Sequence, residues 1–97
     1  MKFDWDPEKD RANQAKHGLS FEEASGIFEG SSDFLELYDA EHSDDEDRFI
    51  GIGNIHTGTI VVVFTEPADD LIRILSARPA TSKERERLAA YWRGKNG

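Results

Sequence analysis

The stretch Arg73-Ile74-Leu75-Ser76-Ala77-Arg78 is followed at once by Pro79 and then by Ala80-Thr81-Ser82-Lys83-Glu84-Arg85. Its first half is apolar apart from two arginines, which is typical of a strand. Pro79 lacks a backbone donor and marks the end of strand pairing. Thr81 and Glu84 have the spacing of a capping box, so a helix begins there. The stretch therefore predicts a strand that leads directly into a helix rich in basic residues.

The residues before this stretch predict an antiparallel sheet. Thr59 to Thr65 is the clearest strand, because four β-branched residues lie between its ends. A turn over residues 66–70 joins it to a returning strand at 71–77. Residues 34–38 and 48–53 have the composition of two further strands. This order indicates a meander of about four strands.

Helices are expected on either side of the meander in the sequence. An aspartate N-cap before a proline starts a helix over residues 7–17, and a capping box starts a second helix that ends at Gly30. The last helix ends near Gly94. Residues 3–5 could add a short edge strand. Helices segregated from an antiparallel sheet predict an α+β fold, with one domain over residues 1–97.

The charge of the chain is unevenly distributed. The formal net charge is −8, which argues against general electrostatic attraction to nucleic acid. Residues 71–97 nevertheless carry seven lysines or arginines and only two acids. This asymmetry predicts an acidic surface and a basic surface with different partners, or simply a solvated basic helix. The chain has no cysteine and no apolar run near the roughly 20 residues that span a bilayer, and we expect a cytoplasmic protein.

The arginines are the first candidates for chemistry. Arg73 and Arg78 are five residues apart, so a straight strand would place them on opposite faces. They converge only if a bulge or a strand end intervenes near Ser76 or Pro79. Arg48, on a neighbouring predicted strand, is the third candidate. Arginine binds phosphate with strong bidentate hydrogen bonds, but each of these arginines could equally pair with a nearby acid.

Lys16 and His17 end the first predicted helix. A histidine exchanges protons near neutral pH, so His17 is a candidate proton donor or acceptor. It could instead only interact with the helix dipole beside Gly18. We assign no role to His42 or His56.

Residues 39–47 form an acidic run that does not match a metal site. A calcium loop needs a glycine at its sixth position and a bidentate acid at its twelfth, and this run has neither. No set of histidines and cysteines suits zinc. A solvated loop is the simplest interpretation, and a docking surface for a basic partner is the functional alternative.

Several short pieces in register along the chain resemble one known family. In chain order they are Phe3-Asp4-Trp5-Asp6-Pro7 with Lys9, Asn13 with Lys16-His17-Gly18-Leu19-Ser20-Phe21-Glu22-Glu23-Ala24 and Phe28, Glu46-Asp47-Arg48 with Ile52-Gly53, Val61-Val62-Val63-Phe64-Thr65, and the segment from Arg73 to Arg78 with Ala80-Thr81 and Glu84-Arg85. Over residues 3–92 the chain resembles the BrnT toxins of bacterial type II toxin–antitoxin systems.

This resemblance implies a compact fold similar to the RelE ribonucleases and cleavage of RNA that inhibits translation. It implies no metal and no cofactor. It also implies a BrnA-like antitoxin that neutralises the toxin in a heterotetramer and contacts operator DNA through a ribbon-helix-helix segment. The implied catalytic residues are Arg73, Arg78 and His17, and the implied RNA- or phosphate-binding residues are Arg48, Lys16 and Arg85.

Two other functions compete with this expectation. A degenerate toxin fold could bind its antitoxin and act only as a co-repressor, in which case expression alone would not arrest growth. A metal-dependent nuclease that uses the acidic run would lose activity in a chelator, but the spacing of the acids does not suggest a ligand set.

Overall fold

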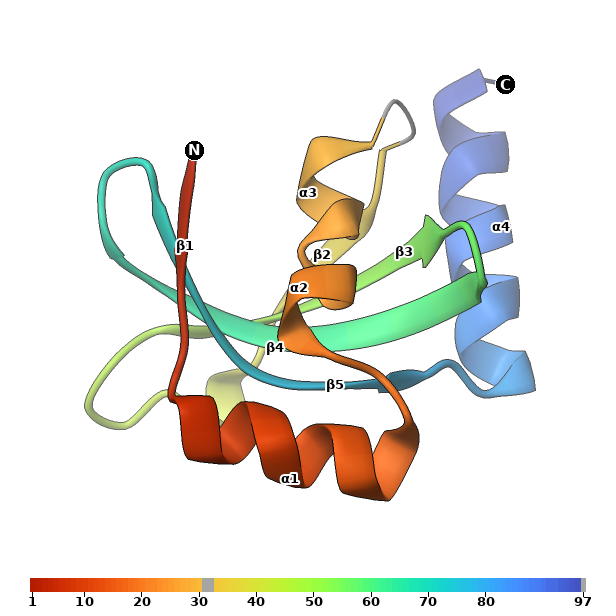
Figure 1. Ribbon diagram of the computed structural model, residues 1–97. Helices are drawn as coiled ribbons and strands as arrows, with labels where there is room; N and C mark the ends of the chain where they lie inside the picture. The colour runs from red at the N-terminus through yellow and green to blue at the C-terminus, as the bar shows by residue number, and fades with distance from the viewer. Residues whose placement is uncertain (31–32, 97) are drawn as a thin grey trace.

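The computed structural model describes residues 1–30 and 33–96 and shows a five-stranded sheet (Figure 1). The strand order is β1-β5-β4-β3-β2. The strands are β1 (Lys2–Asp4), β2 (Leu35–Tyr38), β3 (Arg48–Ile55), β4 (Gly58–Ala68) and β5 (Leu71–Pro79). The four strands β2 to β5 are antiparallel as expected, but β1 adds a fifth that pairs in parallel with β5. The prediction of about four antiparallel strands was therefore one strand short.

The helices begin where the capping signals predicted. They are α1 (Pro7–His17), α2 (Phe21–Ala24), α3 (Gly26–Glu29) and α4 (Ser82–Asn96), with a short 3₁₀ helix η1 (Ala40–His42). Asp6 accepts a hydrogen bond from the Glu8 backbone at 2.8 Å, and Gly18 ends α1 with a φ of 67°. The second predicted helix is divided at Ser25, whose hydroxyl donates to the Glu22 carbonyl.

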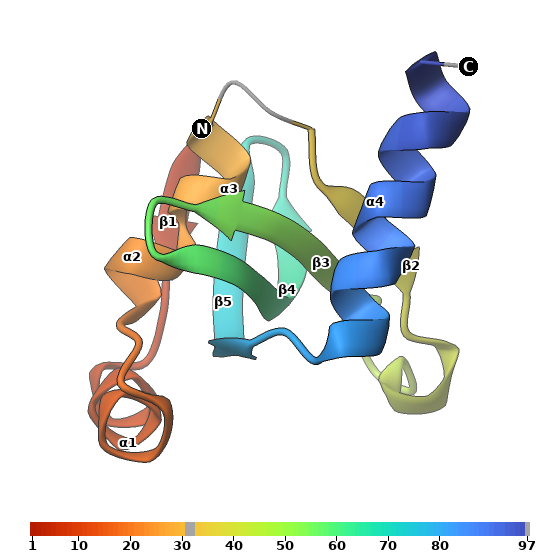
Figure 2. The same cartoon turned by 90° about the vertical axis from the view of Figure 1, so that its right-hand side faces the viewer.

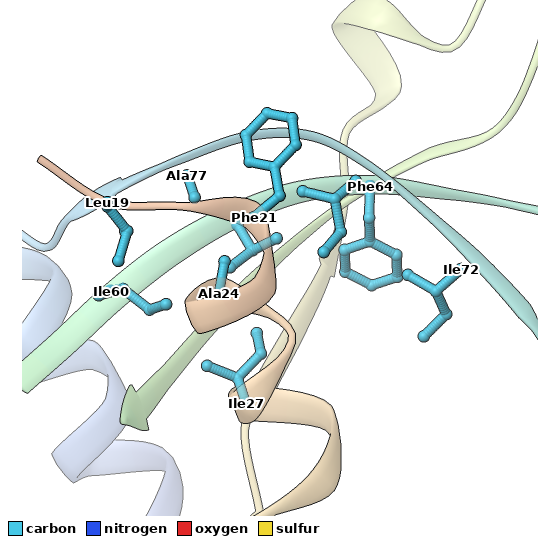
Figure 3. Close-up of a cluster of buried hydrophobic side chains, with 10 residues drawn as sticks. Leu19, Phe21, Ala24, Ile27, Ile60, Phe64, Ile72 and Ala77 are labelled. Atoms are coloured by element: carbon cyan, nitrogen blue, oxygen red, sulfur yellow. The ribbon is translucent and has the colours of Figure 1, made fainter. Parts of the chain in front are cut away.

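The helices cover both faces of the sheet. Figure 2 shows α2 and α3 on one side and α4 on the other, with α1 beside the free part of β5. The larger core lies under α2 and α3 (Figure 3), and its buried members are Leu19, Phe21, Ala24, Ile27, Ile60, Val62, Phe64, Ile72, Ile74 and Ala77. A smaller core under α4 contains Ile52, Val61, Ala80 and Leu88, with Trp92 packed against it. Leu88 and Trp92 therefore hold α4 against the sheet.

Asn13 joins α1 to the free edge of β5. Its side-chain amide donates to the Ala77 carbonyl at 2.8 Å and accepts from the Ala77 backbone N–H at 3.1 Å. The same amide group also donates to the Leu19 carbonyl at 2.8 Å. Asn13 thus satisfies the β5 backbone where β1 no longer reaches, as a neighbouring strand would.

Within the described residues, no helix is both long enough and apolar enough to cross a membrane.

Candidate functional site

A bulge in β5 brings the two arginines of this strand to one face. Ser76 pairs with Val63 and Ile74 pairs with Phe64, so Leu75 has no partner on β4. Arg73 and Arg78 then pair with Thr65 and Val61, which are four residues apart and share a face. The condition set by the sequence, a bulge near Ser76, is therefore met.

Arg48 belongs to the same face. It pairs with Thr65 on β4, which pairs in turn with Arg73 on β5, and Arg73 pairs with Asp4 on β1. Residues opposite each other in neighbouring strands point to the same side of the sheet. We call the surface formed by Arg48, Thr65, Arg73 and Arg78 the arginine face. Its Arg78 end lies beside the residues that α4 covers, and its Arg48 end extends away from that helix.

Asp4 fixes the position of Arg73. The Asp4 carboxylate accepts a hydrogen bond from Arg73 Nη2 at 3.0 Å. This bond, followed by the charge of Asp4, raises the pKa of the Arg73 guanidinium, and the Glu46 carboxylate contributes to the same effect. The Arg73 side chain is 42% exposed, so a charged ligand can still reach it.

Arg78 is held by the first turn of α4. Both Nη atoms donate to the Glu84 carboxylate at 2.7 Å, a bidentate pair. Glu84 also accepts from the Thr81 backbone at 2.8 Å and completes the capping box. The hydrogen bonds from Arg78 are the largest cause that lowers the pKa of Glu84 to about 2. Arg78 therefore anchors the helix start, in addition to any role toward a ligand.

Arg48 is the arginine of this face without a bound acid. Its guanidinium makes no hydrogen bond or ion pair with residues 1–30 or 33–96, and its Nε is buried without a partner. The Oγ1 of Thr65, a residue only 1% exposed, is also buried and has no partner among the residues that the structure describes. Two orphaned polar atoms on one sheet face indicate a place where a ligand or a water completes the hydrogen bonding.

A hollow of about 370 Å³ opens beside Arg48 and Thr65. Its other walls come from the acidic run, and all its lining residues are Glu41, His42, Asp44, Asp45, Glu46, Arg48 and Thr65. The acidic run was expected to be a solvated loop. Most of its carboxylates are exposed, but Asp39 is mostly buried and residues 40–42 form η1. The finding that the run borders an arginine was not predicted.

Hydrogen bonds hold the acidic run in a defined shape. Ser43 Oγ donates to the Asp39 carbonyl at 2.6 Å and accepts from the Arg48 backbone at 2.9 Å. The Asp39 carboxylate contacts His42 Nδ1 at 3.0 Å. His42 was given no role from the sequence, although an aspartate three residues before a histidine was a usable signal for this pair.

The remaining sequence candidates lie elsewhere. Lys16 and His17 end α1, which is on the far side of the sheet from α4 (Figure 2), and they make no hydrogen bond or ion pair with the described arginines. Arg85 lies on α4 and donates to the Ala80 carbonyl and the Ser82 hydroxyl, both at 3.1 Å. Among the described residues no group of three or more histidines or acids has the geometry of a metal site.

Comparisons with known proteins agree with this architecture. The family model described as "Ribonuclease toxin, BrnT, of type II toxin-antitoxin system" matches residues 5–84. The crystal structure of the Brucella abortus ribonuclease toxin BrnT is similar, with a TM-score of 0.62 and 27% sequence identity over 84% of this chain and 99% of that one. A search of curated proteins gave no match. Because the family model covers most of its residues, including the arginine face, the chain belongs to the BrnT family of ribonuclease toxins of type II toxin–antitoxin systems.

Proposed function

We propose that the chain is a cytoplasmic endoribonuclease with a RelE-like fold that cleaves RNA without a metal and so inhibits translation. The observation that supports this best is the sheet register, which places Arg48 and Arg73 on one face, together with the β5 bulge, which adds Arg78 to that face. Three guanidinium groups on one surface suit an RNA phosphate and the extra negative charge of a phosphorane.

The structure suggests different roles for the three arginines. Arg48 has no bound acid, so we assign it to anchoring the scissile phosphate. Arg73, which Asp4 holds in place, would stabilise the charge that develops on the phosphorane. Arg78 would contribute to the same field while it anchors α4. Lys16 and Arg85 are exposed and would attract the RNA backbone, whereas His17 lies apart from the arginine face.

The proposal extends to the partner that the family implies. We infer a BrnA-like antitoxin with a ribbon-helix-helix segment, which forms a heterotetramer with two copies of this chain. Operator DNA would be bound by the antitoxin, because the net charge of −8 on this chain disfavours direct contact with DNA.

Cleavage assays in a chelator test the enzymatic proposal. Arg48→Ala and Arg73→Ala should each lower the cleavage rate about 10²-fold, as loss of a transition-state donor does. Arg11→Ala, which removes an exposed arginine from α1, is the matched control and should retain activity. Arg78→Ala is a poorer test because it also releases Glu84. Undiminished cleavage by folded Arg48→Ala and Arg73→Ala proteins would rule out this site, and loss of cleavage by the parent protein in chelator would rule out metal independence.

A binding-only co-repressor is the second candidate. The observation in its favour is the acidic border of the hollow beside Arg48, because four carboxylates there repel an approaching RNA. Expression without the antitoxin distinguishes the two functions. A ribonuclease toxin arrests growth under these conditions, and a binding-only protein does not.

A further inference from the structure

We propose that His42, oriented by Asp39, is the group that accepts the proton from the RNA 2′-hydroxyl. This inference rests on the proposed ribonuclease function and names the proton-transfer residue that the arginine face itself lacks. The chain has three histidines. Of these, His42 lines the hollow together with Arg48, whereas His17 ends α1 and His56 lies in the turn between β3 and β4.

The pairing with Asp39 is the first argument for this role. The Asp39 carboxylate lies 3.0 Å and 3.2 Å from His42 Nδ1 through its two oxygens. A carboxylate at Nδ1 keeps the proton on that nitrogen and leaves Nε2 as the free acceptor. The Asp39 side chain is only 13% exposed, while His42 is 58% exposed. The carboxylate is therefore fixed, and the imidazole remains open to a substrate.

The surroundings of the imidazole are the second argument. Arg48 reaches the same hollow from β3 and Thr65 reaches it from β4, so a phosphate held by Arg48 would sit close to His42. The charged groups that face this hollow are Glu41, Asp44, Asp45 and Glu46 from the acidic run and Arg48 from the sheet.

The reaction step balances without a metal or an added reagent. Neutral His42 Nε2 takes the 2′-hydroxyl proton, and the 2′-oxygen forms a bond to the adjacent phosphorus. The bond from phosphorus to the 5′-oxygen breaks, and that oxygen takes a proton from solvent. The products are a 2′,3′-cyclic phosphate and a 5′-hydroxyl, and His42 later releases its proton to water.

The test compares matched histidine variants in cleavage of a mixed-sequence RNA, both free and on translating ribosomes. His42→Gln should lower kcat about 10²-fold or more with a KM change below about threefold, because general-base catalysis contributes about 10²–10⁴. His56→Gln, which changes an exposed histidine outside the hollow, is the matched control and should stay within about twofold of the parent. Asp39→Asn should lower kcat by a smaller factor, because it only disturbs the tautomer.

Two further readouts separate proton transfer from a structural role. Added imidazole should restore part of the activity of His42→Ala, and it should not restore the activity of Arg48→Ala. Retained kcat in His42→Gln, or an equal loss in His56→Gln, overturns the inference. If His42→Gln is active while Arg48→Ala and Arg73→Ala are inactive, only this inference fails. If the arginine variants are active as well, the proposed function fails with it.

Discussion

Glu84 shows how one side chain connects the helix start to the arginine face. Its carboxylate caps α4 through Thr81 and binds both Nη atoms of Arg78. The folded state holds its pKa near 2, below its ordinary value of 4.5. Folding therefore favours the ionised form of Glu84. The stabilisation is complete above about pH 4.5 and is lost as the pH falls toward 2.

Glu84→Gln should lower the free energy of unfolding by about 1–3 kcal/mol at pH 7, the value of hydrogen bonds to a charged group. Urea unfolding of parent and variant across pH 2–7 measures this difference. It should shrink between pH 4.5 and 2, because the parent carboxylate is then protonated as well. A difference that is as large at pH 2 as at pH 7 would contradict the role assigned to the ionised carboxylate.

At the residue scale, a substitution of Thr65 should change the stability of the protein and its activity in opposite directions. The Thr65 hydroxyl is buried with no partner in the described part of the chain, and a buried hydroxyl without a partner costs about 1–3 kcal/mol. Thr65→Val should therefore raise the free energy of unfolding by about 1 kcal/mol, measured by urea unfolding. The same variant should cleave RNA more slowly if the hydroxyl meets the substrate beside Arg48. A loss of stability would show that the hydroxyl has a partner in solution.

At the scale of elements, α3 packs so closely against β3 that one position of the strand has no room for a side chain. A Cβ on Gly53 would lie 2.9 Å from Phe34 Cβ and 3.1 Å from Ile27 Cβ. Neither contact is with the far end of a flexible side chain. The glycine is therefore required by packing, in a strand where a side chain would otherwise be favoured.

Gly53→Ala should lower the free energy of unfolding by about 1–3 kcal/mol, because the core is already filled at this point. Gly94→Ala is the control, since a Cβ there meets nothing within 4 Å and a helix interior favours alanine by about 0.5–1 kcal/mol. Thermal unfolding of both variants should shift in opposite directions. An equal shift for the two would mean that the α3–β3 contact is looser than described.

The sequence predicted the elements better than their assembly. Capping boxes at Ser20 and Thr81 are local signals between neighbouring residues, and both helices begin there. The pairing of β1 with β5 depends on residues about 70 positions apart, so no local pattern revealed it. From the sequence, the β5 bulge could be named only as a condition for Arg73 and Arg78 to share a face. Its position could not be predicted, because Leu75 resembles any other apolar strand residue. Thr65 was missed because only the sheet register brings it beside Arg48, and His42 was missed because its place in the hollow depends on the shape of the loop before β3.

At the scale of the whole molecule, the distribution of charge decides how RNA approaches. The net charge is −8, and four of the acids border the hollow beside Arg48. Because acids and arginines share one surface, the affinity for RNA should depend on the position of each acid as well as on the total net charge of the protein. A comparison of two sets of substitutions with equal charge tests this.

The hollow variant carries Glu41→Gln, Asp44→Asn, Asp45→Asn and Glu46→Gln. The control carries Glu8→Gln, Glu22→Gln, Glu29→Gln and Asp69→Asn, which are exposed and outside the hollow. Each set removes four carboxylates, so both change the formal net charge from −8 to −4.

At low salt the hollow variant should bind RNA about tenfold more tightly than the control, and the difference should fade toward 1 M salt, where the Debye length is about 3 Å. Fluorescence anisotropy with a labelled oligonucleotide measures both affinities. Equal gains in the two variants would mean that only the total charge matters.

The parallel pairing of β1 with β5 also determines the order in which contacts can form while the chain is being synthesised. The residues of β1 meet their described neighbour only after residues 71–73 have left the ribosome. Asp4 cannot hold Arg73 before that point, and Arg78 and the helix start that binds it come later still. A shorter nascent chain carries Arg48 alone among the three arginines. A nascent chain that has emerged only as far as residue 70 therefore lacks the complete arginine face.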